Sequence, residues 1–277
     1  MTRPPAIEKL EPGYGPLFDR AVEVFSMDDR VRAMWLSGSL ARGTADRVSD
    51  LDLLVAVSDD AYDDFSATWK EWLSVITPTV IARPLASLPG SFYSVTPGRQ
   101  RFDVVVEAAS ALPTTPFRTR VVVFDHDGLN ATLPAPSPAD GPSKAKIAAL
   151  IEEFFRDYGM FPVVVERSDW LLGLEAIHFL RGLLYQLFVE ANAPQPQMGT
   201  KMWSARLTPT QRAVLQGLPT GRAERDSVID AHEEVAVAFV RHARETCASL
   251  DIRWPDELEA VTLRYLRSYQ LPALEDG

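Results

Sequence analysis

The sequence has a single cysteine, Cys247, and no excess of basic residues. One cysteine cannot form the internal disulfide framework on which small secreted scaffolds depend. Lys and Arg number 28 against 38 Asp and Glu, which gives the 277-residue chain a formal net charge of −10. Non-specific binding to a nucleic-acid backbone depends on clustered Lys and Arg. We therefore expect no nucleic-acid partner and favour small molecules, especially cationic ones.

Long apolar runs are also scarce. No stretch approaches the roughly 20 unbroken apolar residues that a membrane span needs, and the N-terminal MTRPPAIEKLEPGYGP lacks the apolar segment of a signal peptide. With so little cysteine, a cytoplasmic protein without a membrane partner is expected. Hydrophobic residues nevertheless make up 46% of the chain, enough for a sizeable core and, at this length, for two domains.

Residues 1–129 show the alternating pattern of an α/β domain. Helical spacing of apolar residues predicts helices over residues 17–29, directly after Pro16, and over residues 60–76. Short β-branched and aromatic runs, separated mostly by Pro and Gly, predict strands of a mixed sheet. These runs are VRAMWLSGS, LDLLVAV, TVIARPL, GSFYSVT, RFDVVVEA and TRVVVFD.

The character of the sequence changes at residues 130–142, which contain four prolines and no periodicity. This segment is typical of a linker between domains. Residues 143–277 are then dominated by helical patterns, with Ser143 as an N-cap and Pro255 at a helix start. The predicted fold class is α+β: an α/β domain with a mixed sheet, followed by an all-α helical bundle.

The stretch GSLARGTADRVSDLDLLVAV, residues 38–57, places two aspartates beside an apolar strand. Residues i and i+2 of a strand project from the same face, so the carboxylates of Asp50 and Asp52 can converge on one point. Unpaired carboxylates ~5 Å apart repel each other by roughly 3 kcal/mol at an effective dielectric constant near 20. A divalent cation bound between the two carboxylates replaces their repulsion with attraction to the cation. Mg²⁺ suits hard oxygen ligands combined with phosphate. The pair therefore predicts a magnesium site.

Gly38 and Ser39 precede this pair and are predicted to form a phosphate-binding turn. Glycine lets the backbone approach a phosphate, a serine hydroxyl can donate to it, and the start of a short helix over LARGTA offers free N–H groups. Ten residues separate Ser39 from Asp50, enough for that helix and a return to the neighbouring strand. Arg42 could also reach the phosphate, although an arginine in a surface turn is equally expected.

A third carboxylate is expected from the strand RFDVVVEA. Asp103 is the predicted further metal ligand and the base that accepts the proton of an acceptor hydroxyl. Glu107, at i+4 on the same face, is the weaker candidate because it lies at the far end of the strand. The alternative interpretation is a solvated strand end for Asp50 and Asp52, and a surface residue on an edge strand for Asp103.

Together, Gly38-Ser39, the ten intervening residues, Asp50-Leu51-Asp52 and the later Asp103 resemble the nucleotidyltransferase superfamily that includes DNA polymerase β. Size and the helical second half make the chain similar to antibiotic nucleotidyltransferases of the aminoglycoside and lincosamide type. The resemblance implies two Mg²⁺ ions on Asp50 and Asp52, Asp103 as third carboxylate, and Ser39 as triphosphate ligand. It also implies a nucleoside triphosphate donor, with ATP expected.

Further contacts are expected from the second half. The resemblance suggests that Lys201 neutralises the leaving pyrophosphate, whereas a solvated loop lysine is the plainer interpretation. Glu175, His178 and Arg181 form a polar stripe on an otherwise apolar helix. That stripe is either an internal Glu–Arg pair with a satisfied histidine or a surface that contacts nucleotide or acceptor, in which case Glu166 and Asp169 would add negative charge.

The expected activity is transfer of a nucleoside monophosphate, AMP from ATP, to a hydroxyl of a small molecule, by resemblance an aminoglycoside or lincosamide. Haloacid-dehalogenase-type phosphatases and sugar-nucleotide glycosyltransferases also use two nearby aspartates. The phosphatases would not need the upstream Gly-Ser, and the glycosyltransferases usually hold their nucleotide on a longer Rossmann-like segment, which is not seen here. Two further classes remain open. One is a nucleotidyltransferase acting on a protein or tRNA, as in toxin–antitoxin systems, and the other is a non-catalytic nucleotide-binding protein of the same fold.

Overall fold

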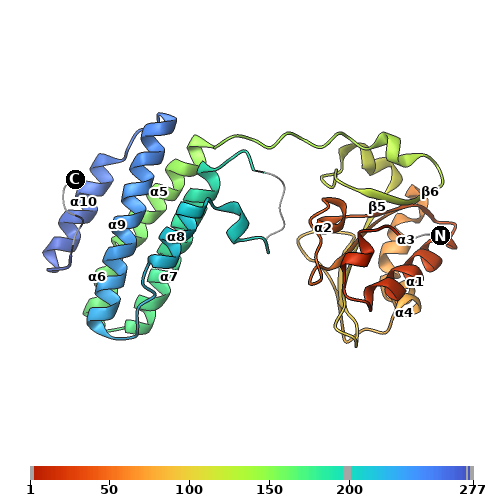
Figure 1. Ribbon diagram of the computed structural model, residues 1–277, viewed down its shortest axis with the longest axis horizontal. Helices are drawn as coiled ribbons and strands as arrows, with labels where there is room; N and C mark the ends of the chain where they lie inside the picture. The colour runs from red at the N-terminus through yellow and green to blue at the C-terminus, as the bar shows by residue number, and fades with distance from the viewer. Residues whose placement is uncertain (1–2, 196–200, 273, 275–277) are drawn as a thin grey trace. The chain divides into compact units, whose positions relative to one another are not determined.

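The computed structural model describes residues 3–195, 201–272 and 274, and the chain divides into two compact units (Figure 1). These units are Met1–Pro138 and Ala139–Gly277. The division lies inside the proline-rich segment predicted as a linker. The first unit continues past residue 129, where the sequence pattern places the end of the α/β domain.

The first unit is built on a six-stranded mixed sheet, as predicted. Only one of its neighbouring strand pairs, β2 with β5, is parallel, and the others are antiparallel. All six strands coincide with the apolar runs read from the sequence. In spatial order they are β3 (Ile81–Pro84), β4 (Ser91–Val95), β5 (Arg101–Ala108), β2 (Leu51–Val57), β1 (Val31–Leu36) and β6 (Val121–Asp125).

The main core of this unit lies between the sheet and the helices on one of its faces. Phe25, Phe65 and Trp72 form an aromatic cluster there, with ring centroids 5.3 Å apart for Phe25–Trp72 and 5.6 Å apart for Phe65–Trp72. The helix predicted over residues 60–76 is divided at Thr68, whose hydroxyl donates to the carbonyl of Asp64 at 2.8 Å. The elements before and beside the sheet are η1 (Ile7–Lys9), α1 (Tyr14–Ser26), η2 (Asp59–Ala61), α3 (Tyr62–Ala67) and α4 (Trp69–Ile76).

Two short 3₁₀ segments, η3 (Ala109–Thr114) and η4 (Leu129–Thr132), accompany a smaller core on the opposite face of the sheet. Trp35 and Leu54 are buried in it, and the indole N–H of Trp35 donates to Asn130 Oδ1 at 2.9 Å. This contact ties η4 to the sheet, and it explains why the unit extends beyond residue 129.

The second unit is helical, as predicted. The first helix of the unit has the predicted N-cap: the Ser143 hydroxyl accepts a hydrogen bond from the backbone N–H of Lys146 at 3.3 Å. Two short helices, α6 and α8, were not anticipated, and α8 begins with a capping box formed by Thr208 and Gln211. The helices are α5 (Lys144–Tyr158), α6 (Phe161–Glu166), α7 (Trp170–Ala191), α8 (Pro209–Gly217), α9 (Arg225–Leu250) and α10 (Asp256–Ser268), with η5 (Ser204–Arg206) before α8.

The core of the helical unit is aromatic where α5 meets α9. Phe154 and Phe239 stack with their centroids 3.9 Å apart, and α5, α7 and α9 run beside one another (Figure 1). Within the described residues α7 alone is long and apolar enough to cross a membrane. Of the 18-residue apolar stretch in this helix, 39% is buried in the protein. The central helix of a bundle satisfies the same criteria of length and composition.

Candidate active site

The register between β2 and β5 brings two of the predicted metal ligands together. Asp52 and Asp103 are direct partners in the parallel pairing, so their Cα atoms lie one strand spacing apart, about 4.8 Å, and their side chains leave the same face of the sheet. Asp50 stands one residue before β2. All three aspartates are partly exposed, so a ligand can reach them from solvent.

The turn after β1 places Gly38 against the Asp52 carboxylate. Gly38 has φ +57°, and a Cβ atom built on it would lie 1.9 Å from Asp52 Oδ2. The Ser37 N–H donates to the carbonyl of Asp52 at 2.9 Å and holds the turn on β2. A residue with a side chain at position 38 would be strained by the backbone conformation and would have to displace the Asp52 carboxylate. The predicted phosphate turn and the predicted metal ligand are neighbours.

The helix that follows is shorter than expected and starts earlier. It is α2 (Gly38–Ala41), only four residues long, so a macrodipole summed over many peptide units is not available at its start. Any phosphate binding at this turn must come from individual N–H groups and the Ser39 hydroxyl. Arg42 ends α2, with its backbone N–H donating to the Gly38 carbonyl at 3.2 Å. Its Nε atom is buried and has no hydrogen-bond partner among the described residues.

An ion pair that the sequence did not suggest connects the first residue of β5 with the residue just before β2. The guanidinium of Arg101 donates through Nη2 to Asp50 Oδ1. The backbone N–H of Arg101 donates to the hydroxyl oxygen of Tyr14 on α1 at 3.0 Å. Burial raises the pKa of the Tyr14 phenol above its ordinary value, so the hydroxyl stays neutral near pH 7. Only the register of β2 with β5 would have revealed this pair.

The donor atoms of the three aspartates suit Mg²⁺ in type. Asp50, Asp52 and Asp103 offer only carboxylate oxygens, the ligand type that Mg²⁺ prefers, and Asp52 and Asp103 are adjacent. Within the part of the chain that the structure describes, however, no group of three His, Cys, Asp or Glu residues is arranged to hold a metal ion. Asp50 is ion-paired with Arg101 instead. The residues fit Mg²⁺ in type and adjacency, and full coordination would need Asp50 to exchange its partner.

Glu107, the weaker candidate for the third carboxylate, has a different task. Its Oε2 accepts from Arg120 Nη2 at 2.7 Å, and the Thr115 hydroxyl donates to its other oxygen. The Arg120 side chain is 1% exposed and lies over the Trp35 ring, 4.9 Å from its centroid. Burial lowers the pKa of Arg120 from its ordinary value, while the Glu107 carboxylate opposes that change. Glu107 therefore neutralises a buried cation.

The polar stripe predicted on α7 is divided in the structure. Glu175 and His178 are exposed and line a cavity of about 460 Å³ whose wall includes Phe161 and Phe179. Arg181 instead donates to three backbone carbonyls at and just beyond the end of α8, those of Leu215 at 3.0 Å, Leu218 at 2.7 Å and Pro219 at 3.1 Å. The expected internal Glu–Arg pair is thus replaced by a cap on α8, and Arg181 has a structural explanation.

The remaining candidates of the helical unit are surface residues. Glu166 ends α6 and Lys201 precedes η5, and both are exposed. Asp169 is the N-cap of α7, where its side chain accepts from the Leu172 N–H at 3.1 Å. That hydrogen bond explains Asp169 as a helix cap. The involvement of Glu166 and Lys201 in substrate binding stays a prediction.

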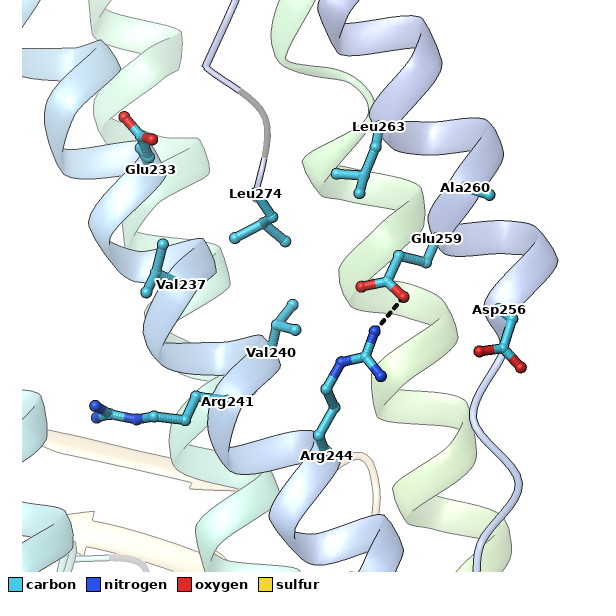
Figure 2. A pocket seen from close by; sticks show the side chains of 10 residues that line it. All are labelled: Glu233, Val237, Val240, Arg241, Arg244, Asp256, Glu259, Ala260, Leu263 and Leu274. Carbon is cyan, nitrogen blue, oxygen red and sulfur yellow. Dashed lines mark hydrogen bonds and ion pairs between the residues drawn. The ribbon is translucent and has the colours of Figure 1, made fainter. Parts of the chain in front are cut away.

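A second cavity in the helical unit, of about 610 Å³, lies between α9 and α10 (Figure 2). Its floor is apolar, with Val240, Leu263 and Leu274. Arg244 and Glu259 face each other across it with a 2.6 Å hydrogen bond, drawn as a dashed line in Figure 2. The sequence pattern pointed to neither residue, because α9 and α10 read there as ordinary amphipathic helices.

Part of the first unit is similar to a known protein family. A family model described as nucleotidyltransferase domain matches residues 19–89, a segment that contains Gly38, Ser39, Asp50 and Asp52. Residues 19–89 are thus similar to a nucleotidyltransferase domain. The match ends before β5, and the register of β5 with β2 places Asp103 beside Asp52, which lies within the matched segment.

Other comparisons were made over the whole chain. Curated proteins give no match. Among solved structures, an aminoglycoside 6-adenyltransferase from Bacillus subtilis is similar over 91% of this chain and 97% of its own, at 14% sequence identity and a TM-score of 0.44.

Proposed function

We propose that the protein is a Mg²⁺-dependent nucleotidyltransferase that transfers a nucleoside monophosphate, AMP from ATP, to a hydroxyl group of a small molecule. One observation supports this most directly: in a nucleotidyltransferase domain, the carboxylates of Asp52 and Asp103 stand side by side on parallel strands, with the Gly38 backbone packed against Asp52. Pyrophosphate would be the leaving group.

Each residue of the site has a definite task in this proposal. The Ser39 hydroxyl and neighbouring backbone N–H groups donate to the β and γ phosphates. Asp50, Asp52 and Asp103 would hold two Mg²⁺ ions, which neutralise triphosphate charge and polarise the bond to the leaving pyrophosphate when bound. Asp103 accepts the proton of the acceptor hydroxyl. Catalysis would rest on positioning and charge neutralisation rather than on a covalent enzyme intermediate.

The proposed acceptor is an aminoglycoside or lincosamide antibiotic. This rests on the resemblance of the sequence motifs to antibiotic nucleotidyltransferases and on the chain's net charge of −10, which favours a cationic partner. Glu166, Glu175 and His178 are the proposed acceptor contacts in the helical unit, and Lys201 is the proposed partner of the leaving pyrophosphate. Cytoplasmic location belongs to the same proposal.

A second candidate is a nucleotide-binding protein of this fold that performs no transfer. The ion pair between Asp50 and Arg101 favours it, since that pair engages one of the expected metal ligands. Such a protein would bind ATP in the presence of Mg²⁺ and release no pyrophosphate with any acceptor.

The two candidates are separated by incubating the protein with each nucleoside triphosphate, Mg²⁺ and a panel of aminoglycosides and lincosamides. Mass spectrometry should detect an acceptor heavier by one nucleoside monophosphate, and an enzymatic assay should detect pyrophosphate. Asp52→Asn should abolish both signals. Asp60→Asn is the matched control, because Asp60 is an exposed aspartate of η2, beyond the other end of β2. Undiminished transfer by Asp52→Asn would contradict the proposal.

A further inference from the structure

The ion pair between Arg101 and Asp50 lies at the mouth of the proposed nucleotide site. Arg101 is the first residue of β5, two positions before Asp103, and Asp50 is two positions before Asp52. The ion pair places Arg101 beside Asp50, and the register places Asp103 beside Asp52, so one guanidinium adjoins a group of three carboxylates. It supplies positive charge at a place where the like charges of the aspartates would otherwise repel one another.

The backbone and the side chain of Arg101 differ in how firmly they are held. The backbone belongs to β5, pairs with Val95 of β4, and donates to the hydroxyl of the buried Tyr14. The side chain is 39% exposed, whereas that of Asp50 is only 11% exposed. Arg101 can therefore change the direction of its guanidinium without a change in the strand, while Asp50 keeps its place.

A guanidinium and a divalent cation compete for the same carboxylate oxygens. If a metal ion takes the Asp50 carboxylate, the Arg101 guanidinium loses its partner and lies beside the metal-bound phosphates. Guanidinium is well suited to that second partner, because its planar N–H groups match the oxygens of phosphate in a two-point contact. No displacement of β5 is needed for the exchange.

We propose that Arg101 neutralises Asp50 while the metal site is empty and turns to the triphosphate of the nucleotide when Mg²⁺ binds. This inference rests on the proposed function. It assigns to Arg101 two opposite effects: it weakens the binding of a metal ion alone and strengthens the binding of the metal–nucleotide complex. A residue that only supports the fold would affect both in the same direction.

The test compares wild-type protein with Arg101→Met in two binding measurements. Electron paramagnetic resonance with Mn²⁺ alone should show tighter binding in the variant, by about 3-fold, as expected from loss of one partly exposed ion pair. Titration with ATP at saturating Mg²⁺ should show binding weaker by about 10-fold or more, as expected from loss of a charge-assisted contact. Arg83→Met is the matched control, since Arg83 lies on the edge strand β3 and donates to the Ala82 carbonyl. It should change neither affinity.

Arg101→Lys keeps the positive charge but not the two-point geometry, and it serves if the methionine variant does not fold. It should bind Mn²⁺ alone as the wild type does and should bind Mg²⁺–ATP several-fold more weakly. Circular dichroism melting establishes the fold of each variant. The inference is overturned if both affinities fall together in Arg101→Met or if neither changes. A wild-type protein that binds neither Mn²⁺ nor ATP would overturn the proposed function itself.

Discussion

Gly38 packs against Asp52 in the proposed nucleotide site. The backbone at position 38 has a positive φ and fills the space beside the carboxylate, so the position of one determines the position of the other. Two ion pairs lie nearby, between Arg101 and Asp50 and between Arg120 and Glu107, and the guanidinium of Arg101 is the more exposed of the two. At the residue scale, these residues therefore form pairs. In each pair, a conservative substitution of one residue removes its interaction with the other.

Gly38→Ala should eliminate Mg²⁺-dependent ATP binding, because the added Cβ pushes the Asp52 carboxylate out of place. The positive φ adds a conformational cost of roughly 1–2 kcal/mol. Gly43→Ala is the matched control: Gly43 has φ +73°, and its added Cβ would meet no atom within 4 Å. Urea denaturation should show a similar backbone cost in both variants, while isothermal titration should show loss of ATP binding only in Gly38→Ala. Equal ATP binding by the two variants would contradict the role of Gly38.

Asp103→Asn and Glu107→Gln should separate chemistry from stability on one strand. Asp103→Asn should abolish nucleotide transfer with little change in the free energy of unfolding. Glu107→Gln removes the charge that neutralises the buried Arg120, so the free energy of unfolding should fall by about 3 kcal/mol or more. Urea denaturation and the mass-spectrometric transfer assay measure the two quantities. The assignment of the third carboxylate would be wrong if transfer depended on Glu107 in folded protein and not on Asp103.

At the scale of elements, helices and strands are held by contacts that lie far from the proposed chemistry. The three carbonyls bound by Arg181 fix the end of α8 to α7. His232 of α9 is enclosed by α5 and α6, with its ring 4.9 Å from that of Tyr158 and 3.6 Å from that of Phe161. The helical unit therefore contains polar groups whose first task is to join helices.

Burial lowers the pKa of His232 to about 3, from an ordinary value of 6.5. Below pH 6.5 the unfolded chain binds a proton at this histidine while the folded chain does not, so the unfolded state gains stability. The contribution of His232 is present in full above pH 6.5 and is lost as the pH falls toward 3, at up to about 1.4 kcal/mol per pH unit.

His232→Phe should reduce this loss, because phenylalanine keeps the ring stacking and binds no proton. Urea denaturation at pH 7.5 and pH 5 should show a smaller fall in unfolding free energy for the variant than for wild type. His178→Gln, on the exposed face of α7, should behave as wild type. An unchanged pH dependence in His232→Phe would show that His232 does not carry the effect.

At the scale of the whole molecule, the chain consists of two units that each have a core of their own. The first is organised around the mixed sheet and the second around α5, α7 and α9. The polypeptide passes from one to the other between Pro138 and Ala139. The proposed metal ligands and the phosphate-binding turn belong to the first unit, whereas Lys201, the proposed partner of the leaving pyrophosphate, belongs to the second.

A fragment of residues 139–277 should fold without the first unit, since its apolar side chains form a separate buried cluster. Circular dichroism should show a helical spectrum and one cooperative thermal transition. A fragment that melts gradually, or that gives the spectrum of an unfolded chain, would show that the helical unit needs the nucleotidyltransferase domain for its stability.

Local patterns were enough to predict many features of this protein. Short β-branched and aromatic runs identified the six strands of the sheet, the period of apolar residues identified the long helices, and Ser143 marked the start of α5. Gly38-Ser39 and Asp50-Leu51-Asp52 indicated nucleotidyltransferase chemistry, because a strand places alternate residues on one face whatever its neighbours are. These features depend on residues that are close together in the chain.

Contacts between distant residues were decided only by the tertiary structure. Parallel register, not spacing, made Asp103 rather than Glu107 the neighbour of Asp52, and it brought Arg101 to Asp50. Glu107 instead forms an ion pair with the buried Arg120, which comes from a later segment of the chain. A strand's own sequence determines which residues share a face, but the strand beside it, and the register between them, follow from how the entire sheet packs.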